Sequence, residues 1–368
     1  MATPGLKLLL AGDLMLGRGM DQVLPQHCTP ELVEPCVHDA RTYVRLAEAR
    51  HGPIPAPVPH VYPWGMALAL MRELAPDLFL VNLETAITTA DHPWPGKAVH
   101  YRLHPGNVAC LTAAGIHGCC LANNHVLDWG FNGLAETLRC LQQVGIASTG
   151  AGLSLHQAQG PLALPLAGGG RLLVFARALA SSGVPDAWQA QLHRPGVALL
   201  PQLNAGTARA LARSVCKHRR PGDRVLLSLH WGANWVEQIP ELHRWFAHQM
   251  IDLAGVDVVF GHSSHHPLPL EVYGGKLILY GCGDLLNDYE GIGAERRWRS
   301  DCPCLYSLEL DRLNGELECL EIVPLRLRRF QLQWPEPADR LWLQGQLGLE
   351  AAAAGRFGGW RLQRDRLP

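Results

Sequence analysis

Short apolar runs divide the chain, and five of them end beside a residue that can bind a metal or carry a proton. The runs are residues 8–10, 78–81, 119–122, 225–229 and 256–260, and the polar residues that follow are Asp13, Glu84, Asn124, His125, His230, His262 and His265. Successive apolar residues predict strands that are buried on both faces, as in a parallel sheet. Ligands of open α/β sheets bind at the carboxyl ends of such strands. The pattern therefore predicts an α/β enzyme whose site gathers these side chains.

Apolar positions at helical spacing lie between several of these runs. They are Leu134, Leu138 and Leu141 before Gly145, and Leu242, Phe246, Met250 and Leu253 before Gly255. A glycine just after an apolar stripe suits the end of a helix. Helices that alternate with buried strands are typical of βαβ units, so we expect a layered sheet structure.

Proline marks the segments that depart from this alternation. Six prolines between Pro30 and Pro59 predict that residues 28–65 are an insertion with one helix and an extended loop. Pro335 and Pro337 divide a main domain, residues 1–334, from a C-terminal appendage, residues 335–368. We expect an Ala-rich helical stretch in the appendage and assign it no chemistry.

Composition excludes several classes of protein. The chain has 368 residues, a formal net charge of -1 and dispersed basic residues, so it lacks the positive surface expected of a nucleic-acid-binding protein. No apolar stretch approaches the length of a membrane span, and no signal-peptide pattern stands before Gly12. Eleven irregularly spaced cysteines indicate thiols in a reducing compartment. We expect a cytoplasmic protein, and the sequence does not indicate its oligomeric state.

The polar residues at the strand ends suit a metal site. His262 and His265 lie in a histidine cluster that matches the needs of a divalent metal or a proton relay. Asp128 follows His125 at a spacing that allows it to orient the imidazole. With the carboxylates of Asp13 and Glu84, these residues form an oxygen and nitrogen donor set suited to zinc, manganese or iron.

Five motifs resemble those of the CapA proteins of poly-γ-glutamate capsule synthesis, a family of the calcineurin-like metallophosphoesterase superfamily. They are Gly12-Asp13-Leu-Met-Leu-Gly-Arg18, Asn82-Leu-Glu84, Ala122-Asn-Asn-His125 with Asp128 and Gly130, Leu229-His-Trp-Gly232, and Gly261-His262 through His265. The resemblance covers residues 7 to about 330. It implies a four-layer α/β/β/α sandwich with the site at one edge of the paired sheets.

The resemblance also implies a role for each matching residue. Asp13 and His265 would face one metal position, with Asn124, His230 and His262 at the other and Glu84 between them. His125 would be the acid beside the scissile bond. Two positions depart from the superfamily pattern: Met15 replaces a histidine ligand, and Asn82-Leu-Glu84 replaces a segment with a bridging aspartate. Thioether sulfur is a poor ligand for a hard ion, so we expect one bound metal or none.

Three functions fit this site. The first is metal-assisted hydrolysis of a phosphoester or of a γ-glutamyl or peptide-type substrate, with Asp13, His125 and Asp128 as the candidate catalytic groups. Lys97 or Arg102 would lie near the anion of the substrate, Trp231 would form a wall of the pocket, and Asp284 would reach into it. The second is metal-independent peptide epimerisation by Asp13 and one of His230, His262 or His265. The third is an inert scaffold that binds a polyanionic polymer.

Overall fold

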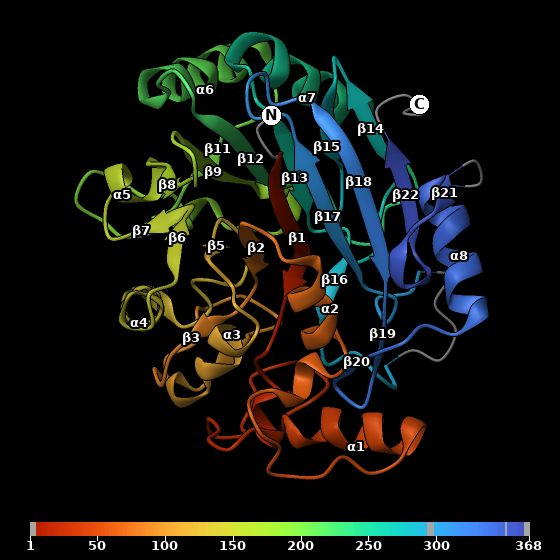
Figure 1. Cartoon of the computed structure of the whole chain (residues 1–368). Helices are drawn as coiled ribbons and strands as arrows, with labels where there is room; N and C mark the ends of the chain where they lie inside the picture. The colour runs from red at the N-terminus through yellow and green to blue at the C-terminus, as the bar shows by residue number, and fades with distance from the viewer. Residues whose placement is uncertain (1–4, 293–297, 350–351, 364–368) are drawn as a thin grey trace.

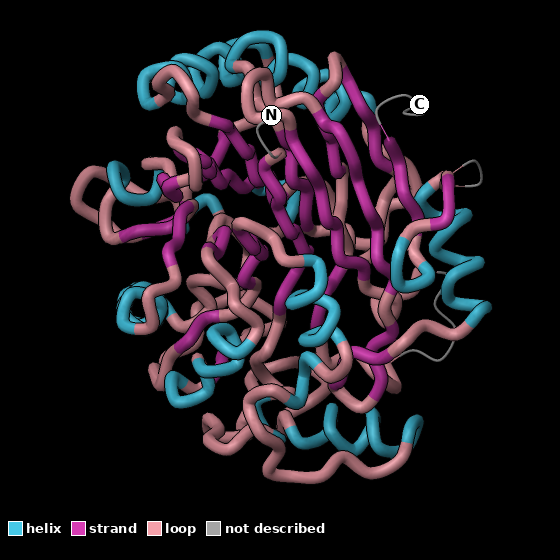
Figure 2. Tube along the Cα trace, in the orientation of Figure 1, coloured by secondary structure: helices cyan, strands magenta, loops and turns pink. Residues whose placement is uncertain are grey.

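The computed structural model describes residues 5–292, 298–349 and 352–363. Within these residues the chain forms two large β-sheets, of nine and seven strands, that pack against each other (Figure 1). Figure 2 shows that the helices lie around the outside of this pair of sheets. The fold is therefore of the α/β class, as the alternation of strands and helices predicts.

The first sheet is built around the N-terminal strand. Its strand order is β21 (Ala353–Ala354), β22 (Trp360–Gln363), β18 (Leu317–Pro324), β17 (Cys304–Leu310), β1 (Leu6–Leu14), β2 (Leu78–Leu83), β5 (Gly118–Cys120) and β6 (Ala147–Thr149), and β16 (Asp284–Leu286) also pairs with β1. Strands β1, β2, β5 and β6 are parallel, whereas β17, β18 and β22 continue the sheet in antiparallel pairs.

The second sheet has a parallel centre. Its strand order is β11 (Leu199–Leu200), β9 (Arg171–Leu179), β12 (Arg224–His230), β13 (Val258–His262), β15 (Lys276–Leu279) and β14 (Leu270–Tyr273), and β8 (Leu162–Pro165) also pairs with β9. Three small sheets join β7 (Ala151–Gly152) to β10 (Gly196–Val197), β3 (Ala86–Ile87) to β4 (Arg102–Leu103), and β19 (Arg326–Arg328) to β20 (Gln331–Gln333). All five apolar runs thus supply strands of the two large sheets.

Helices cover the outer faces of both sheets. Their bounds are α1 Arg41–His51, α2 Ala67–Leu74, α3 Ala109–Ala113, α4 Gly130–Gln143, α5 Leu155–Gln159, α6 Ala205–His218, α7 Glu241–Ala254 and α8 Pro337–Leu347. The predicted helix before Gly145 is α4, and the one before Gly255 is α7. The buried face of α7 is formed by Phe246 and Met250, whereas Leu242 and Leu253 are 50% and 44% exposed. The predicted apolar stripe of α7 is therefore wrong at both ends.

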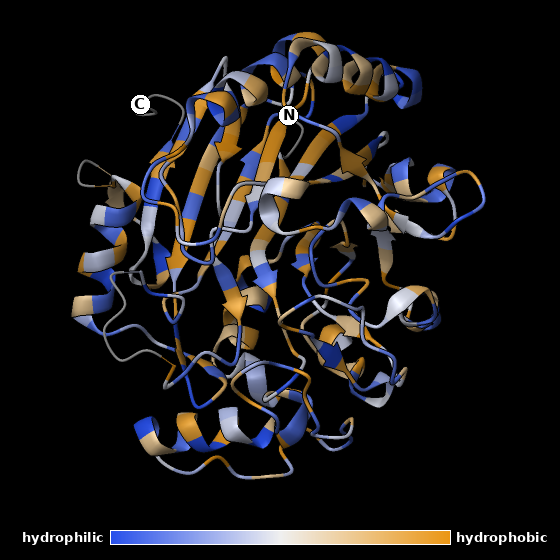
Figure 3. Cartoon of the chain, turned by 180° about the vertical axis from the view of Figure 1, so that it is seen from behind, coloured by the Kyte–Doolittle hydropathy of each residue, from blue (hydrophilic) through white to orange (hydrophobic). Residues whose placement is uncertain are grey.

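Two apolar cores define the layers. Leu80 of the first sheet and Val174 and Phe260 of the second belong to the core between the sheets. Phe175, which follows Val174 on β9, points the other way and packs in the core beneath α6 and α7. On the opposite side, α2 and α3 line the same surface depression as Leu9 of β1. Figure 3 shows apolar residues concentrated on the strands. The layers follow the α/β/β/α order.

The Pro-rich segment and the C-terminal segment differ in how they relate to the sheets. Residues 28–65 contain α1 and an extended Pro-rich loop. The C-terminal segment, expected as an appendage, adds β22 to the first sheet through pairs such as Ile322 with Trp360. Ala353 and Ala354 form strand β21 rather than part of a helix, and the helix of this segment is α8.

Two further observations concern the class of protein. No helix in the described part of the chain is both long enough and apolar enough to cross a membrane. The eleven cysteines are all free thiols. Burial raises the pKa of Cys110 and of Cys120 to about 12, so these thiols are unreactive at neutral pH.

Candidate metal and proton-transfer site

The predicted site residues converge where the parallel strands of both sheets end. Asp13 lies near the end of β1, Glu84 follows β2, and His230 and His262 are the last residues of β12 and β13. His230 and His262 are register partners in adjacent parallel strands. Each of these four side chains is at least 98% buried.

The backbone approaches very closely beside Asp13. A Cβ atom on Gly12 would lie 1.8 Å from the carbonyl oxygen of Gly283, so only glycine fits there. The approach allows the Asp13 amide to donate a hydrogen bond of 2.9 Å to Gly283 O. It also makes Asp13 the register partner of Asp284 in β16.

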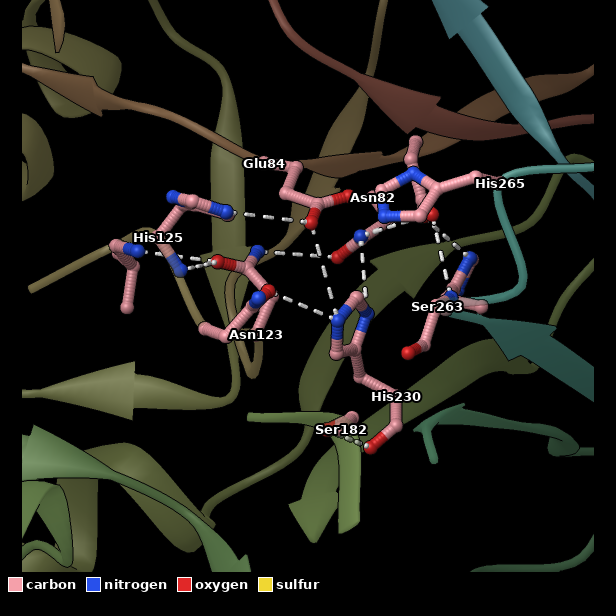
Figure 4. A network of polar contacts seen from close by, with 12 residues as sticks. Asn82, Glu84, Asn123, His125, Ser182, His230, Ser263 and His265 are labelled. Atoms are coloured by element: carbon pink, nitrogen blue, oxygen red, sulfur yellow. Dashed lines mark hydrogen bonds and ion pairs between the residues drawn. The ribbon is translucent and has the colours of Figure 1, made fainter. Parts of the chain in front are cut away.

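Asp13, Glu84 and His230 form the first donor group. One ligand atom from each lies within 4.8 Å of the others. Asn82 Nδ2 donates a hydrogen bond of 2.8 Å to Asp13 Oδ1 and thereby orients that carboxylate. Glu84 points into the space between His125, His230 and His265 (Figure 4), and its Oε1 lies 3.9 Å from Nε2 of both His125 and His230. Neither oxygen of Glu84 has a hydrogen bond within the described structure, although both are buried.

Asp13, His265 and Asp284 form a second donor group, in which one ligand atom from each residue again lies within 4.8 Å of the others. His265 Nδ1 lies 2.9 Å from Asp284 Oδ1, and Asn287 Nδ2 donates to Asp284 Oδ2 at 2.9 Å. The sequence pointed to Asp284 only as a substrate contact. Its neighbours in β16 are apolar and the strand has three residues, so the pairing with β1 that brings it to Asp13 had no signal in the sequence.

Asn124 and His262 border these groups without belonging to them. Asn124 Oδ1 lies 3.1 Å from His230 Nε2. His262 Nδ1 lies 3.3 Å from Asp13 Oδ1, and its Nε2 lies 3.0 Å from Ser228 Oγ. His262 therefore contacts a donor of both groups, and Asn124 positions a donor of the first.

The three carboxylates respond differently to burial. Burial opposes the charge of Asp13, but the hydrogen bond to His262 and the nearby His230 and His265 lower its pKa below the ordinary value. Burial and then the neighbouring Asp13 raise the pKa of Glu84 well above its ordinary value. Burial is also the main cause that raises the pKa of Asp284 to about 6. Asp13 holds its charge, whereas Glu84 requires a proton or a cation.

His125 is oriented by Asp128, which Tyr101 and Lys97 hold in turn. Its Nδ1 lies 2.6 Å from Asp128 Oδ2, which also accepts the Tyr101 amide at 2.7 Å. Lys97 Nζ lies 2.6 Å from the other oxygen of Asp128 and contacts the Asn124 carbonyl. An ionised carboxylate can only accept, so Nδ1 of His125 carries the proton and Nε2 is left as a base. Burial first, and Lys97 in addition, lower the pKa of His125 to about 4.

A cavity of about 390 Å³ opens beside His125 and His265. Lys97 lines this cavity, as does Trp235, whose ring stacks on His265 at 5.0 Å between centroids. The backbone φ values of 60° at Trp235 and 58° at His265 are strained for residues other than glycine. Both loops beside the cavity, the one that carries His265 and the one that carries Trp235, therefore contain a strained residue.

Two expected substrate contacts lie elsewhere. The Arg102 guanidinium donates to Ala90 O at 2.7 Å and to Thr29 Oγ1 at 2.8 Å and stacks over Trp129, so its charge is directed away from the cavity. Trp231 is buried in the core under α7, where Nε1 donates to Tyr280 O at 3.0 Å and the ring stacks on His243. Both residues are fixed by packing, which their positions next to motifs did not reveal.

The α/β/β/α layers, with oxygen and nitrogen donors at the carboxyl ends of strands from both sheets, define an α/β sandwich protein with a candidate metal site. Residues 7–289 match the family described as bacterial capsule synthesis protein PGA_cap. The chain belongs to this CapA-like family.

Sequence relatives give the same placement. The chain is 46% identical over 341 residues to a protein of Mycobacterium tuberculosis (strain ATCC 25618 / H37Rv) named "Probable polyglutamine synthesis accessory protein", and the match covers 92% of this chain and 90% of the relative. It is 26% identical over 219 residues to the PGA biosynthesis protein CapA of Bacillus subtilis (strain 168), covering 58% and 54% of the two chains. A phosphatase from Mycoplasma pneumoniae superposes with a TM-score of 0.49 and 13% identity over 92% of this chain and 97% of that chain.

Proposed function

We propose that the protein is a metal-assisted hydrolase of γ-glutamyl or peptide-type amide bonds, acting in support of poly-γ-glutamate synthesis. The observation that carries the proposal is the buried Glu84 carboxylate, whose two oxygens lack hydrogen bonds while Asp13 and His230 place further donor atoms beside it. A buried carboxylate in this state costs free energy unless a cation or a proton neutralises it. The names of the relatives support the link to the polymer.

The donor chemistry fits one divalent ion. Asp13, Glu84 and His230 would hold zinc, manganese or iron, and a bound ion would supply Lewis acidity and an activated water molecule. The group of Asp13, His265 and Asp284 is less suited to a second ion, because His265 and Asp284 already pair with each other. Met15, at the position where the superfamily has a histidine ligand, is consistent with a single ion.

The protein's own residues then supply the proton transfers. His125 is neutral at neutral pH, and Nε2 is its free nitrogen. It is thus suited to take a proton from the attacking water and to return it to the leaving amine, as a base that becomes the acid. Asp128 stabilises the charged form of His125, while Lys97 holds Asp128 in place. His125 therefore acts first as a base toward water and then as the acid that the sequence analysis expected.

Elemental analysis tests the proposal. The protein is purified without added metal and without a histidine tag, together with Asp13→Ala, His230→Ala and the control His248→Ala. His248 pairs with Glu271 away from the donor groups. We expect about one equivalent of zinc, manganese or iron in the parent and the control and little in the other two variants. Hydrolysis of γ-glutamyl oligomers, with an aryl phosphodiester as the alternative substrate, should require that metal.

One observation favours epimerisation as a second function. The pairs His125 with Asp128 and His265 with Asp284 have Nδ1 to oxygen distances of 2.6 and 2.9 Å, and both histidines line the same cavity. Two such pairs on either side of Glu84 could remove a proton from a carbon beside a carbonyl and return it to the other face (Figure 4). Of the predicted partners, His265 lines this cavity, whereas Asp13, His230 and His262 are at most 2% exposed, so His125 takes the place of Asp13 in this pair.

The two enzyme functions are distinguished by isotope exchange. A metal-free protein that incorporates deuterium at the α-carbon of a peptide in D₂O, without cleaving it, would contradict hydrolysis and support epimerisation.

The third function, an inert scaffold for a polyanion, has less support. Lys97 and Arg18, the lysine and arginine among the described residues that line the cavity, are each already paired with carboxylates.

A further inference from the structure

A second set of cavity residues takes no part in the proposed chemistry. Arg18, Glu34, Tyr43, Tyr101 and Tyr289 all line the cavity that His125 and His265 also line. We call these five residues the wall of the cavity. Glu34 and Tyr43 belong to the insertion, residues 28–65, so this segment forms part of the wall. The arrangement is rigid, because each polar group in it has a defined partner.

Arg18 is the centre of this wall. Its Nε and Nη2 donate to the two oxygens of Asp288 at 2.8 and 2.5 Å, and Nη1 donates to Glu34 at 2.9 Å. Tyr43 also donates to Glu34, at 2.5 Å, and its ring lies 3.6 Å below the guanidinium carbon. Arg18 therefore serves to hold the insertion against the core.

The charge of the wall disfavours an anionic ligand. One guanidinium faces two carboxylates, Glu34 and Asp288, and Lys97 across the cavity is balanced by Asp128. A second carboxylate or a phosphate would meet excess negative charge in a site of low dielectric, where like charges repel strongly. A neutral polar group meets no such barrier.

The polar group that the wall does offer is a pair of tyrosine hydroxyls. Tyr101 Oη and Tyr289 Oη lie 2.8 Å apart, and neither hydroxyl has another hydrogen-bond partner among the described residues. One hydroxyl proton is used inside the pair and the other is left to donate. Burial raises the pKa of both tyrosines, so both keep their protons. The ring of Tyr101 stacks on His125 at 4.0 Å, which places the pair beside the proposed base.

We propose that the Tyr101–Tyr289 hydroxyl pair binds an uncharged amide carbonyl of the substrate and that this wall selects a neutral group over a carboxylate or phosphate. The inference rests on the proposed hydrolase function and deepens it, because it assigns the substrate to the peptide class. Any α-carboxylates of a γ-glutamyl chain would then face the solvent rather than this wall.

The test measures binding instead of turnover. The probes are two γ-glutamyl tripeptides of equal length, one with free α-carboxylates and one with α-carboxamides, titrated into the protein by calorimetry, with inorganic phosphate as a third probe. The variants are Tyr289→Phe and Tyr101→Phe, which keep the rings, and the control is Tyr273→Phe. The Tyr273 hydroxyl bonds to Asp252 on the far side of the second sheet, so its loss removes a hydrogen bond outside the cavity.

We expect the carboxamide tripeptide to bind more tightly than the carboxylate form and than phosphate. Either cavity variant should weaken its binding about fivefold, the effect of one neutral hydrogen bond, with no change in the control. Tighter binding of the carboxylate form or of phosphate would overturn the proposal. Equal affinity in the parent and both cavity variants, or no binding of the carboxamide form, would overturn it too.

Metal content and cleavage are measured on the same samples. A protein that binds the carboxamide tripeptide through the tyrosine pair but holds no metal and cleaves nothing would contradict the hydrolase function alone. A metal-containing, active protein whose binding ignores both tyrosines would contradict this inference alone.

Discussion

Asp13 and Asp284 are register partners in the parallel strands β1 and β16, although they are 271 positions apart in the sequence. The two carboxylates do not behave alike. Asp13 keeps its charge through His262 and the other nearby imidazoles, while burial raises the pKa of Asp284 to about 6. With His265 at 2.9 Å, Asp284 is suited to proton exchange, and Asp13 to holding a cation.

Glu84→Gln should have opposite effects on metal binding and on stability. Loss of the carboxylate should weaken metal binding at least as much as loss of an outer ligand partner, about 10- to 100-fold. In EDTA, the same change removes an unsatisfied buried acid beside Asp13 and should stabilise the fold by about 1 kcal/mol. Urea unfolding with and without metal measures both effects.

The control for this variant is Glu136→Gln. Glu136 accepts hydrogen bonds from Thr88 Oγ1 and the Thr89 amide, so its substitution should destabilise the protein slightly in either condition. A Glu84→Gln protein that is less stable than the parent in EDTA would contradict the interpretation of Glu84 as a buried carboxylate without hydrogen bonds.

Asp128→Asn should impair turnover without loss of metal. The amide cannot stabilise the protonated form of His125, and Lys97 loses its counter-charge. We expect kcat to fall about 10²- to 10⁴-fold, the usual contribution of general acid and base catalysis. Steady-state kinetics with the best γ-glutamyl substrate measures the effect, and Asp39→Asn, at a surface ion pair with Arg41, is the control. Unchanged kcat would remove His125 from the mechanism.

Gly12→Ala should weaken the contact between β1 and β16. The added methyl would overlap Gly283 O and displace the segment before Asp284, at a cost of about 1 to 3 kcal/mol. Gly345→Ala is the matched control, because that position lies in α8 with no atom within 4 Å of a new Cβ. It should be neutral or stabilising, by up to about 1 kcal/mol. Denaturant midpoints distinguish the two outcomes, and equal stability of both variants would contradict the close approach.

His243→Phe should make the protein less sensitive to acid. Burial lowers the pKa of His243 to about 4, so protonation favours the unfolded state as pH falls below the ordinary histidine value of about 6.5. The stacking on Trp231, at 4.2 Å, can be kept by phenylalanine. Relative to the parent, the variant should gain about 2 kcal/mol between pH 7.5 and pH 5. Thermal unfolding at the two pH values tests this, and a parallel pH dependence of both proteins would contradict it.

The convergence of the strand-end residues could be predicted from the sequence because parallel strands place their carboxyl ends at one edge of a sheet. Asp13, Glu84 and His125 follow strands of the first sheet, and His230 and His265 follow strands of the second. The meeting of the two sheet edges was implied by the family resemblance. The α/β class followed from the same alternation of apolar runs and helical stripes.

The remaining errors arise because position along the chain gives neither side-chain direction nor the pairing of distant strands. Arg102 lies beside the site in sequence, but its guanidinium is directed to Ala90, Thr29 and the face of Trp129. Leu242 fits the stripe of α7 yet lies at its exposed first turn. The pairing of β16 with β1 depends on the glycines at 12 and 283, whose effect appears only when the two strands meet.

The strand order of the first sheet also sets when that sheet can be completed. Its interior contains β1, from residues 6–14, and it is extended by β17, β18 and finally β22, from residues 360–363. During synthesis β1 can pair early with β2, but its partner on the other side, β17 (residues 304–310), emerges much later, and pairing over such sequence separations is slow. Until then, the apolar face of β1 is a segment that a chaperone would be expected to shield.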